Sequence, residues 1–119
     1  MKLLSSLTAL ALAGAAVADF VAFPDNLSCL STTGTRIITL AELESAVLNN
    51  KRSLIEKNAS NMAVGAACQR LTDSLYAVDF PEVGSIYFVF KPSTGTYTFC
   101  SGAGVPEDGI GYPSVCQAV

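Results

Sequence analysis

Four cysteines constrain the fold of this chain more than any other feature of its sequence: Cys29, Cys68, Cys100 and Cys116. An even number of cysteines in a small exported domain favours two disulfide bonds, because an oxidising compartment preserves them. The count alone leaves three pairings open. A zinc site is the alternative, but no two cysteines lie close together in the sequence and the chain has no histidine. We therefore expect two disulfides, and neither a metal nor another cofactor.

The first 18 residues indicate export. Lys2 is followed by an uncharged apolar stretch from Leu3 to Val17, and Ala16-Val17-Ala18 has the small residues of a signal-peptidase cleavage site. A transmembrane helix is the alternative, but the stretch is rich in alanine and has no basic residues at its end. We expect residues 1–18 to be a cleaved signal peptide. Residues 19–119 should then form a single secreted domain that does not contact membranes.

The charge of the mature part argues against binding along a nucleic-acid backbone. After removal of Lys2, 6 basic and 10 acidic residues remain, which gives a net charge of −4. The basic residues are scattered apart from one adjacent pair, at positions 36, 51, 52, 57, 70 and 91. Phosphate binding depends on clustered lysine and arginine, so this distribution is typical of a solvated surface.

One helix is predicted in the first half of the domain. Thr39 followed by Glu42 has the pattern of a capping box, in which each residue satisfies a backbone N–H of the other. The apolar residues that fall near one face of this helix are Leu40, Leu43, Val47 and Leu54. The helix is expected to end at Asn49 or to continue as far as Lys57. The polar segment 19–36 before it suits an irregular arm or a β-hairpin.

The second half has the composition of an antiparallel sheet. Segments 85–90 and 96–100 are rich in aromatic and β-branched residues, and the segment between them contains a proline and a glycine. Segment 76–80 is a further predicted strand, which Pro81 ends. The sequence therefore predicts an α+β domain, in which one N-terminal helix packs on an antiparallel β-sheet.

Two segments of the second half have less regular patterns. Residues 62–75 are compatible with a second short helix or with the lead into a strand, and the sequence leaves this choice open. Residues 101–113 are rich in glycine and proline, so we expect a loop that leads to Cys116.

Few side chains are suited to catalysis. Without histidine, the nucleophile–histidine pairs of many hydrolases are excluded. Asp79 and Glu82 are a candidate carboxylate pair, but they flank a Phe-Pro turn, where solvated charges are common. The aromatic residues of the predicted strands could stack on nucleotide bases, yet so small a domain needs most of them in its core: Tyr87, Phe88, Phe90, Tyr97 and Phe99.

Two triplets match the acceptor sequence for N-glycosylation. They are Asn26-Leu27-Ser28 and Asn58-Ala59-Ser60. In a eukaryotic secretory pathway, such asparagines would be surface positions, since an attached glycan must remain in solvent. Triplets of this kind also occur by chance, so Asn26 and Asn58 are candidates only.

The order of these features resembles that of the fungal extracellular ribonucleases, a superfamily of guanyl-specific ribonucleases and sarcin-type ribotoxins. The resembling features are Cys29, the capped helix, Cys68, the segment Tyr76-Ala77-Val78-Asp79-Phe80-Pro81, Phe88-Val89-Phe90, Thr98-Phe99-Cys100 and Cys116. The step from Cys100 to Cys116 is similar to that of the ribotoxin-like members. The resemblance implies a microbial-ribonuclease-like fold with nested disulfides, Cys29–Cys116 and Cys68–Cys100.

The chain departs from this family where catalysis takes place. In the family, a glutamate removes the 2′-hydroxyl proton, a histidine protonates the leaving oxygen and an arginine stabilises the developing charge. Asp79 stands at the glutamate position, the arginine position falls on Tyr87, Phe88 or Val89, and the histidine position falls within 102–105. None of these replacements supplies a cation or an imidazole. The resemblance therefore implies a ribonuclease-like protein without ribonuclease catalysis.

Secreted members of this family that have lost catalysis include effectors of plant-associated fungi. The resemblance thus implies an effector or virulence protein that binds a host protein, with RNA as a weaker alternative partner, outside the producing cell or after entry into host cells. Two other hypotheses remain. One is an active endoribonuclease that uses Asp79 or Glu82, and the other is a small β-rich cell-wall or allergen-like protein.

Overall fold

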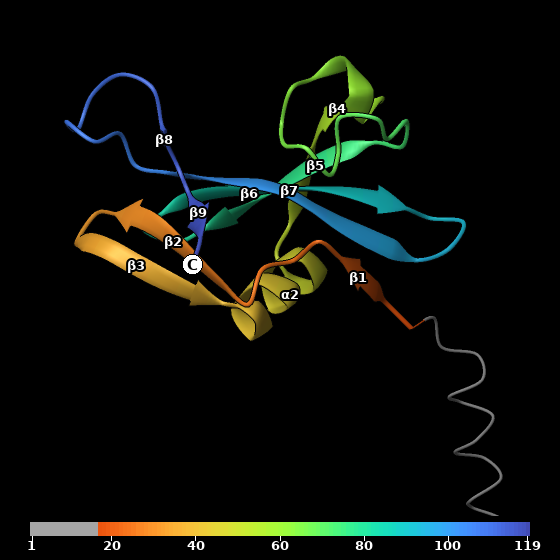
Figure 1. Cartoon of the computed structure of the whole chain (residues 1–119), viewed down its shortest axis with the longest axis horizontal. Helices are drawn as coiled ribbons and strands as arrows, with labels where there is room; N and C mark the ends of the chain where they lie inside the picture. Colours follow the sequence, from red (N-terminus) through yellow and green to blue (C-terminus); the bar gives the residue numbers. More distant parts are fainter. Residues whose placement is uncertain (1–16) are drawn as a thin grey trace, which may run out of the picture.

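The computed structural model describes residues 17–119 and is mostly β, with 46% strand and 13% helix (Figure 1). The elements are β1 (Asp19–Val21), β2 (Asn26–Ser31), β3 (Gly34–Thr39), α2 (Leu40–Asn49), β4 (Arg52–Glu56), the short 3-10 helix η1 (Ala59–Asn61), β5 (Leu75–Phe80), β6 (Gly84–Lys91), β7 (Thr96–Gly104), β8 (Ser114–Val115) and β9 (Gln117–Ala118). The predicted α+β class with an N-terminal helix is therefore wrong, because three strands precede α2. Residues 1–16 of the predicted signal peptide lie outside the described residues.

Two sheets make up the domain. The main sheet has the strand order β1-β7-β6-β5-β4, and β8 also pairs with β7. Its strands are antiparallel neighbours except β1, which runs parallel to β7. A smaller antiparallel sheet has the order β3-β2-β9. Figure 1 shows α2 and the small sheet on one side of the main sheet, while two loops rise from its other side.

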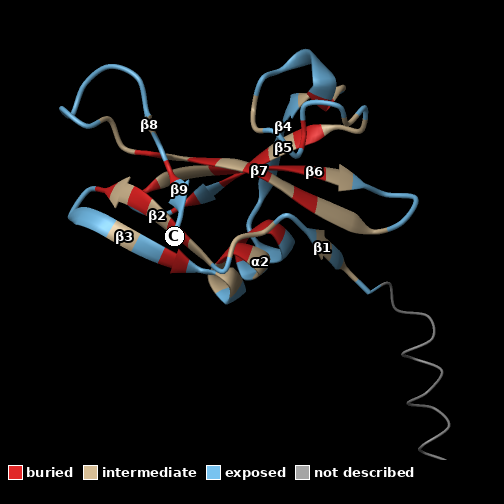
Figure 2. Cartoon of the chain, in the orientation of Figure 1, coloured by how far each residue is buried: buried red, intermediate tan, exposed pale blue. Residues whose placement is uncertain are grey.

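The side of the main sheet that packs on α2 is called the helix face, and the other side the open face. The helix face contributes Val78, Ile86 and Phe88 to the larger core cluster, against Leu43 and Val47 of α2. Figure 2 shows buried residues concentrated where the elements meet in this way. A second cluster lies on the open face and contains Ala59, Cys68, Leu75, Val89 and Cys100. The helix face is thus covered by α2, and the open face is covered in part by the segment that contains Cys68.

The predicted start of the helix is confirmed. The hydroxyl of Thr39 accepts a hydrogen bond from the Glu42 N–H at 3.2 Å, and the Glu42 carboxylate accepts one from the Thr39 N–H at 3.0 Å. The helix ends at Asn49 and does not reach Lys57. Asn50 is extended, and its side-chain amide donates to the Asp79 carbonyl oxygen at 2.9 Å. This contact ties the helix end to β5.

Residues 52–56 form a strand, although the sequence allows a longer helix there. Leu54, which the helical pattern places on the buried face, lies in the edge strand β4 and is 52% exposed. The backbone of β4 pairs with that of β5 and satisfies hydrogen-bonding groups that β5 would otherwise present to solvent. Long-range pairing therefore decides this segment, and local helix propensity does not.

The three strands predicted in the second half are present as β5, β6 and β7. β7 extends to Gly104, so residues 101–104 are strand and the predicted loop begins only at Val105. Pairing with Ser85–Tyr87 of β6 and with β8 accounts for this extension. Between η1 and β5 the chain forms no second α-helix, and the segment leads into the strand β5 at Leu75, which is the other alternative that the sequence leaves open.

The chain has two disulfide bonds, with the pairing that the resemblance implies. Cys29–Cys116 joins β2 to the residue between β8 and β9, within the larger core cluster. Cys68–Cys100 attaches the segment between η1 and β5 to β7, within the cluster on the open face.

No helix within residues 17–119 is both long enough and apolar enough to span a membrane.

Candidate functional site

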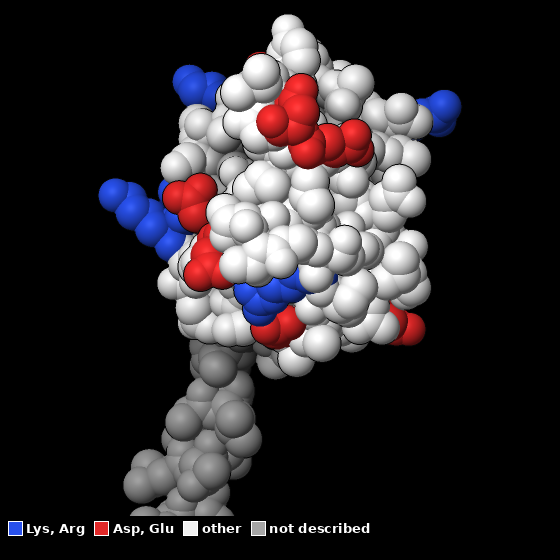
Figure 3. Space-filling view, turned by 90° about the vertical axis from the view of Figure 1, so that its left-hand side faces the viewer, with Lys and Arg blue, Asp and Glu red and all other residues white. Residues whose placement is uncertain are grey.

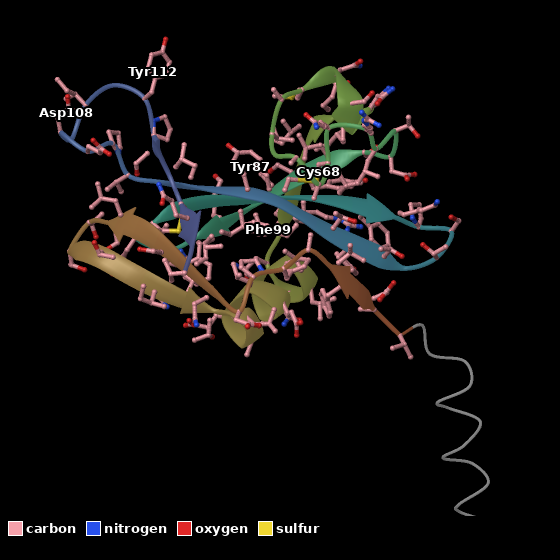
Figure 4. All side chains as sticks on the ribbon, viewed as in Figure 1. Cys68, Tyr87, Phe99, Asp108 and Tyr112 are labelled. Carbon is pink, nitrogen blue, oxygen red and sulfur yellow. A yellow bond between two sulfur atoms is a disulfide. The ribbon has the colours of Figure 1, made fainter. Side chains whose placement is uncertain are left out.

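A groove of about 480 Å³ lies on the open face of the main sheet. Its floor is formed by Tyr87 of β6 and by Ser101 and Ala103 of β7. The two walls come from β4 with the segment after η1, and from β8 with the residue before it: Ile55, Met62, Ala63, Val64 and Gly65 on one side, and Pro113, Ser114 and Val115 on the other. In Figure 4, Tyr87 and Phe99 lie on opposite sides of the sheet.

The groove is lined by apolar and uncharged groups. Its lining residues include no acidic or basic side chain. The hydroxyl of Ser114 donates to the Val105 carbonyl oxygen at 2.6 Å, so it is already used within the domain. Tyr87 and Ser101 are the other hydroxyl-bearing residues of the lining. Such a surface suits the burial of apolar groups from a ligand, with few polar contacts to orient it.

The structure brings only some of the predicted catalytic positions together. Tyr87, one of the three residues on which the arginine position can fall, lines the groove, and so do Gly102 and Ala103 from the segment 102–105 that contains the histidine position. Phe88 is buried on the helix face and Val89 is buried in the other cluster. Asp79 is exposed on β5, where it pairs with Ser85, and does not contribute to the lining.

Glu82, the other carboxylate of the proposed pair, lies in the turn between β5 and β6. It is exposed, and its backbone has a positive φ of 67°. Its carbonyl oxygen accepts a hydrogen bond from the Thr32 N–H at 2.9 Å, which links this turn to the β2–β3 hairpin. Glu82 therefore has an evident structural contact, and it is not among the residues that line the groove.

The arginines nearest the core lie away from the groove. Arg36 forms an ion pair with Glu42 at 2.8 Å, and its guanidinium lies 4.8 Å from the centre of the Phe80 ring. Arg52 stacks over the rings of Tyr76 and Phe90, at 4.6 and 4.8 Å. These contacts stabilise the side chains on aromatic surfaces of the helix face. They do not supply a cation to the groove.

Most of the strand aromatics pack in the core, as the size of the domain predicts. Phe88 is fully buried, and Phe90, Tyr97 and Phe99 pack against the cluster on the helix face. Tyr97 also stacks on Phe20 of β1, with 5.6 Å between the ring centres. Of the five aromatics considered for base stacking, Tyr87 alone lines the groove.

The loop between β7 and β8, residues 105–113, carries apolar side chains in solvent. Ile110 is 75% exposed and Tyr112 is 93% exposed. Gly109 and Gly111 have φ values of 81° and 89°, in the left-handed region that favours glycine, so the sequence encodes the shape of the tip. The first residue of the loop is held by a hydrogen bond from the Val105 N–H to the Leu30 carbonyl oxygen at 3.0 Å. Figure 4 shows Asp108 and Tyr112 at the outer part of this loop.

Sequence reasoning missed both the groove and this loop as candidate sites. The available signal was the presence of isoleucine and tyrosine between glycines and prolines, where a solvent-exposed loop normally has polar residues. No comparable signal marks the walls of the groove, which come together only in the folded chain.

The two glycosylation candidates have different surroundings. Asn26 is half-buried at the start of β2, where it pairs with Thr39 and its carbonyl oxygen accepts from the Val119 N–H. Asn58 caps η1, and its side-chain oxygen accepts hydrogen bonds from the N–H and the hydroxyl of Ser60 at 3.0 and 2.6 Å. Asn58 thus lies at a turn, whereas Asn26 lies in the small sheet.

No family model, curated protein or solved structure matches this chain. The relation to extracellular ribonucleases, secretion and the effector role stay predictions from the sequence. In residues 17–119, no group of three or more histidine, cysteine, aspartate or glutamate side chains is placed to hold a metal ion.

Proposed function

We propose that this chain is a secreted, non-catalytic effector-type protein related to the extracellular ribonucleases, and that it binds a host protein through the groove. The observation that carries the proposal is the chemistry of the groove. Its lining includes Tyr87, one candidate for the arginine position, and Ala103 from the segment that contains the histidine position, and it is apolar and uncharged. A volume of about 480 Å³ is large enough to accept a few side chains of a bound segment.

Apolar side chains supply the binding energy in this proposal. Ile55, Met62 and Val115 line the groove and are 40%, 37% and 74% exposed. Covering such surface stabilises a complex by roughly 25 cal/mol for each Å² of apolar area removed from water. These three side chains are therefore expected to become buried when a partner binds.

RNA is the less favoured partner. The affinity of a protein for a nucleic-acid backbone comes mainly from lysine and arginine that neutralise phosphates. The mature part has a net charge of −4, and the groove lining contributes no cation. Arg36 and Arg52 are engaged with aromatic rings, and Arg36 also with Glu42.

Peptide selection tests the proposed groove. Random peptides displayed on phage are selected on the immobilised mature protein, and the enriched peptides are synthesised and measured by titration calorimetry. Val115→Asp places a charge on the groove wall and is expected to weaken binding at least about tenfold, since 1.4 kcal/mol corresponds to a factor of ten. Val21→Asp is the matched control, because Val21 is 43% exposed and does not line the groove.

Two results would overturn the proposal. One is equal binding of the selected peptides to the two variants, or the enrichment of no peptide at all, which contradicts binding at the groove. The other is cleavage of RNA by the mature protein to 2′,3′-cyclic phosphate ends, with the activity abolished in Asp79→Ala, which contradicts a non-catalytic protein.

A further inference from the structure

The groove continues beyond its apolar centre in two directions that differ in charge. On one side, the wall residues Met62 and Ala63 line both the groove and an adjoining depression that contains Gln69 and Arg70. Arg70 is exposed, and the single ion pair found within residues 17–119 is Arg36–Glu42, so the Arg70 guanidinium is free of such a partner. A ligand that extends over this wall therefore meets a positive charge.

On the other side, the wall made by Pro113 and Val115 continues into the β7–β8 loop, and Val115 lines a depression together with Glu107. This loop presents Tyr112 and then the exposed carboxylates of Glu107 and Asp108. Figure 3 shows acidic side chains gathered at the top of the face where this loop lies in Figure 1. The Asp108 carboxylate accepts a hydrogen bond from the Ile110 N–H at 3.1 Å, which holds the tip in place.

From this arrangement we propose that the groove binds an extended peptide segment with an apolar centre, an acidic flank over Arg70 and a basic flank beside Glu107 and Asp108. This inference rests on the proposed function and adds the chemistry of its partner. The apolar centre of the segment supplies most of the affinity. The two flanks determine which end of the segment lies over which wall, because the reversed placement would bring like charges together.

The contribution of each flank is modest, because these charges are exposed to solvent. An exposed ion pair contributes a factor of about 1.5 to 5 in an equilibrium constant. Reversal of one charge replaces attraction by repulsion, so we expect about threefold to tenfold weaker binding for each reversal. High salt is expected to reduce the difference, since at about 1 M ionic strength the screening length is only about 3 Å.

Reversal of charges on the protein, and then on the peptide, tests the inference. The peptides enriched on the wild-type protein are expected to carry acidic residues on one side of an apolar centre and basic residues on the other. Binding of one such peptide is measured to Arg70→Glu and Glu107→Lys, and to Lys91→Glu as a control at an exposed lysine outside the groove. Glu107 is used because Asp108 supports the loop.

The expected result is weaker binding to Arg70→Glu and Glu107→Lys, with no change for Lys91→Glu. A peptide whose acidic flank is made basic should bind Arg70→Glu better than the original peptide does, and a merely apolar groove would not produce this rescue. Enriched peptides without the charge pattern, or unchanged affinity in both variants, would overturn the inference. If Val115→Asp still weakens binding in that case, the groove stands and only the charged flanks are wrong.

Discussion

Glu42 shows how one side chain determines a local structure in this protein. Its carboxylate accepts from the Thr39 N–H at the start of α2 and also pairs with Arg36 of β3 at 2.8 Å. The same residue therefore closes the first turn of the helix and joins it to the strand before it. Its side chain is 40% exposed, so these contacts are accessible to solvent and to changes in pH.

The pH dependence of Glu42 can be tested by removing its charge. The hydrogen bond from the Thr39 backbone, and then the positive charge of Arg36, hold the pKa of Glu42 below its ordinary value of 4.5. A lowered pKa in the folded state means that the stabilisation is present above about pH 4.5 and is lost as the pH falls through the folded pKa. Glu42→Gln should lower the free energy of unfolding by about 0.5 kcal/mol at pH 7.

Chemical denaturation at pH 7 and at pH 3 measures this effect. The stability difference between wild type and Glu42→Gln should shrink between pH 7 and pH 3, because the wild-type carboxylate loses its charge as the pH falls through its lowered pKa. Glu44→Gln on the same helix serves as the control, since Glu44 forms no ion pair with another described residue. A difference that is the same at both pH values would show that the charge of Glu42 is not the cause.

Asn58 is the better placed of the two glycosylation candidates. Both asparagines are half-buried, but a glycan on Asn58 projects from a turn, whereas one on Asn26 must be accommodated on a strand residue between β3 and β9. When the chain is expressed through a eukaryotic secretory pathway, we expect a glycan that is lost in Asn58→Gln and retained in Asn26→Gln. Mass spectrometry before and after enzymatic deglycosylation distinguishes the two, and the opposite pattern would refute this assignment.

Among the elements, the segment between η1 and β5 depends most on a covalent bond. Its first residues form most of one wall of the groove, yet the segment contains no helix or strand. The disulfide Cys68–Cys100 attaches it to β7. The packing around this bond comes from Ala59, Leu75 and Val89. Without the disulfide, we expect the wall to lose its defined position while the strands behind it remain paired.

Removal of this disulfide should therefore impair groove binding more than it disrupts the strands of the sheet. Cys68→Ala/Cys100→Ala is expected to lower the free energy of unfolding by about 3–4 kcal/mol, the value that chain entropy gives for a loop of this length. Groove binding should be lost even under conditions where circular dichroism shows an intact sheet. Calorimetric titration with the groove peptide checks this, and undiminished affinity would show that the wall is held by its other contacts.

The elements that could be predicted from the sequence are those whose own residues encode them. The capping box of Thr39 and Glu42 determined the start of α2, and the aromatic and β-branched residues of 85–90 and 96–100 determined the β6–β7 hairpin. β4 could not be predicted, because its composition also suits a helix and its pairing with β5 decides the outcome. The groove could not be predicted either, since its walls are distant in sequence and have no periodic pattern of their own.

For the molecule as a whole, the predicted class was wrong because the first strands were underestimated. The hairpin that the sequence allows before the helix is present as β2 and β3, but β1 in addition forms one edge of the main sheet, and the hairpin belongs to a separate small sheet. β1 pairs with β7 in parallel, and the Asp19 N–H donates to the Gly95 carbonyl oxygen at 3.1 Å. β1 thus begins at the residue that is predicted to follow signal-peptide cleavage.

The packing of β1 against β7 predicts that this N-terminal strand contributes to the stability of the whole domain. Phe20 stacks on Tyr97, and Phe23 contacts Phe20 and Phe99, with ring centres 5.4 to 5.6 Å apart. Deletion of residues 19–23 removes both phenylalanines, each of which is half-buried, so we expect a loss of about 2–3 kcal/mol in the free energy of unfolding. Deletion of residues 17 and 18 alone should have no effect, because Val17 is 83% exposed.

Denaturation of the three purified forms, beginning at residues 17, 19 and 24, measures these differences. If the form that begins at residue 24 is as stable as the others, β1 is a dispensable edge strand and the aromatic contacts contribute little. If it is less stable by the expected amount, the boundary at Asp19 has a physical meaning, since cleavage further into the chain would remove part of the core. N-terminal sequencing of the secreted protein should then give Asp19 as the first residue.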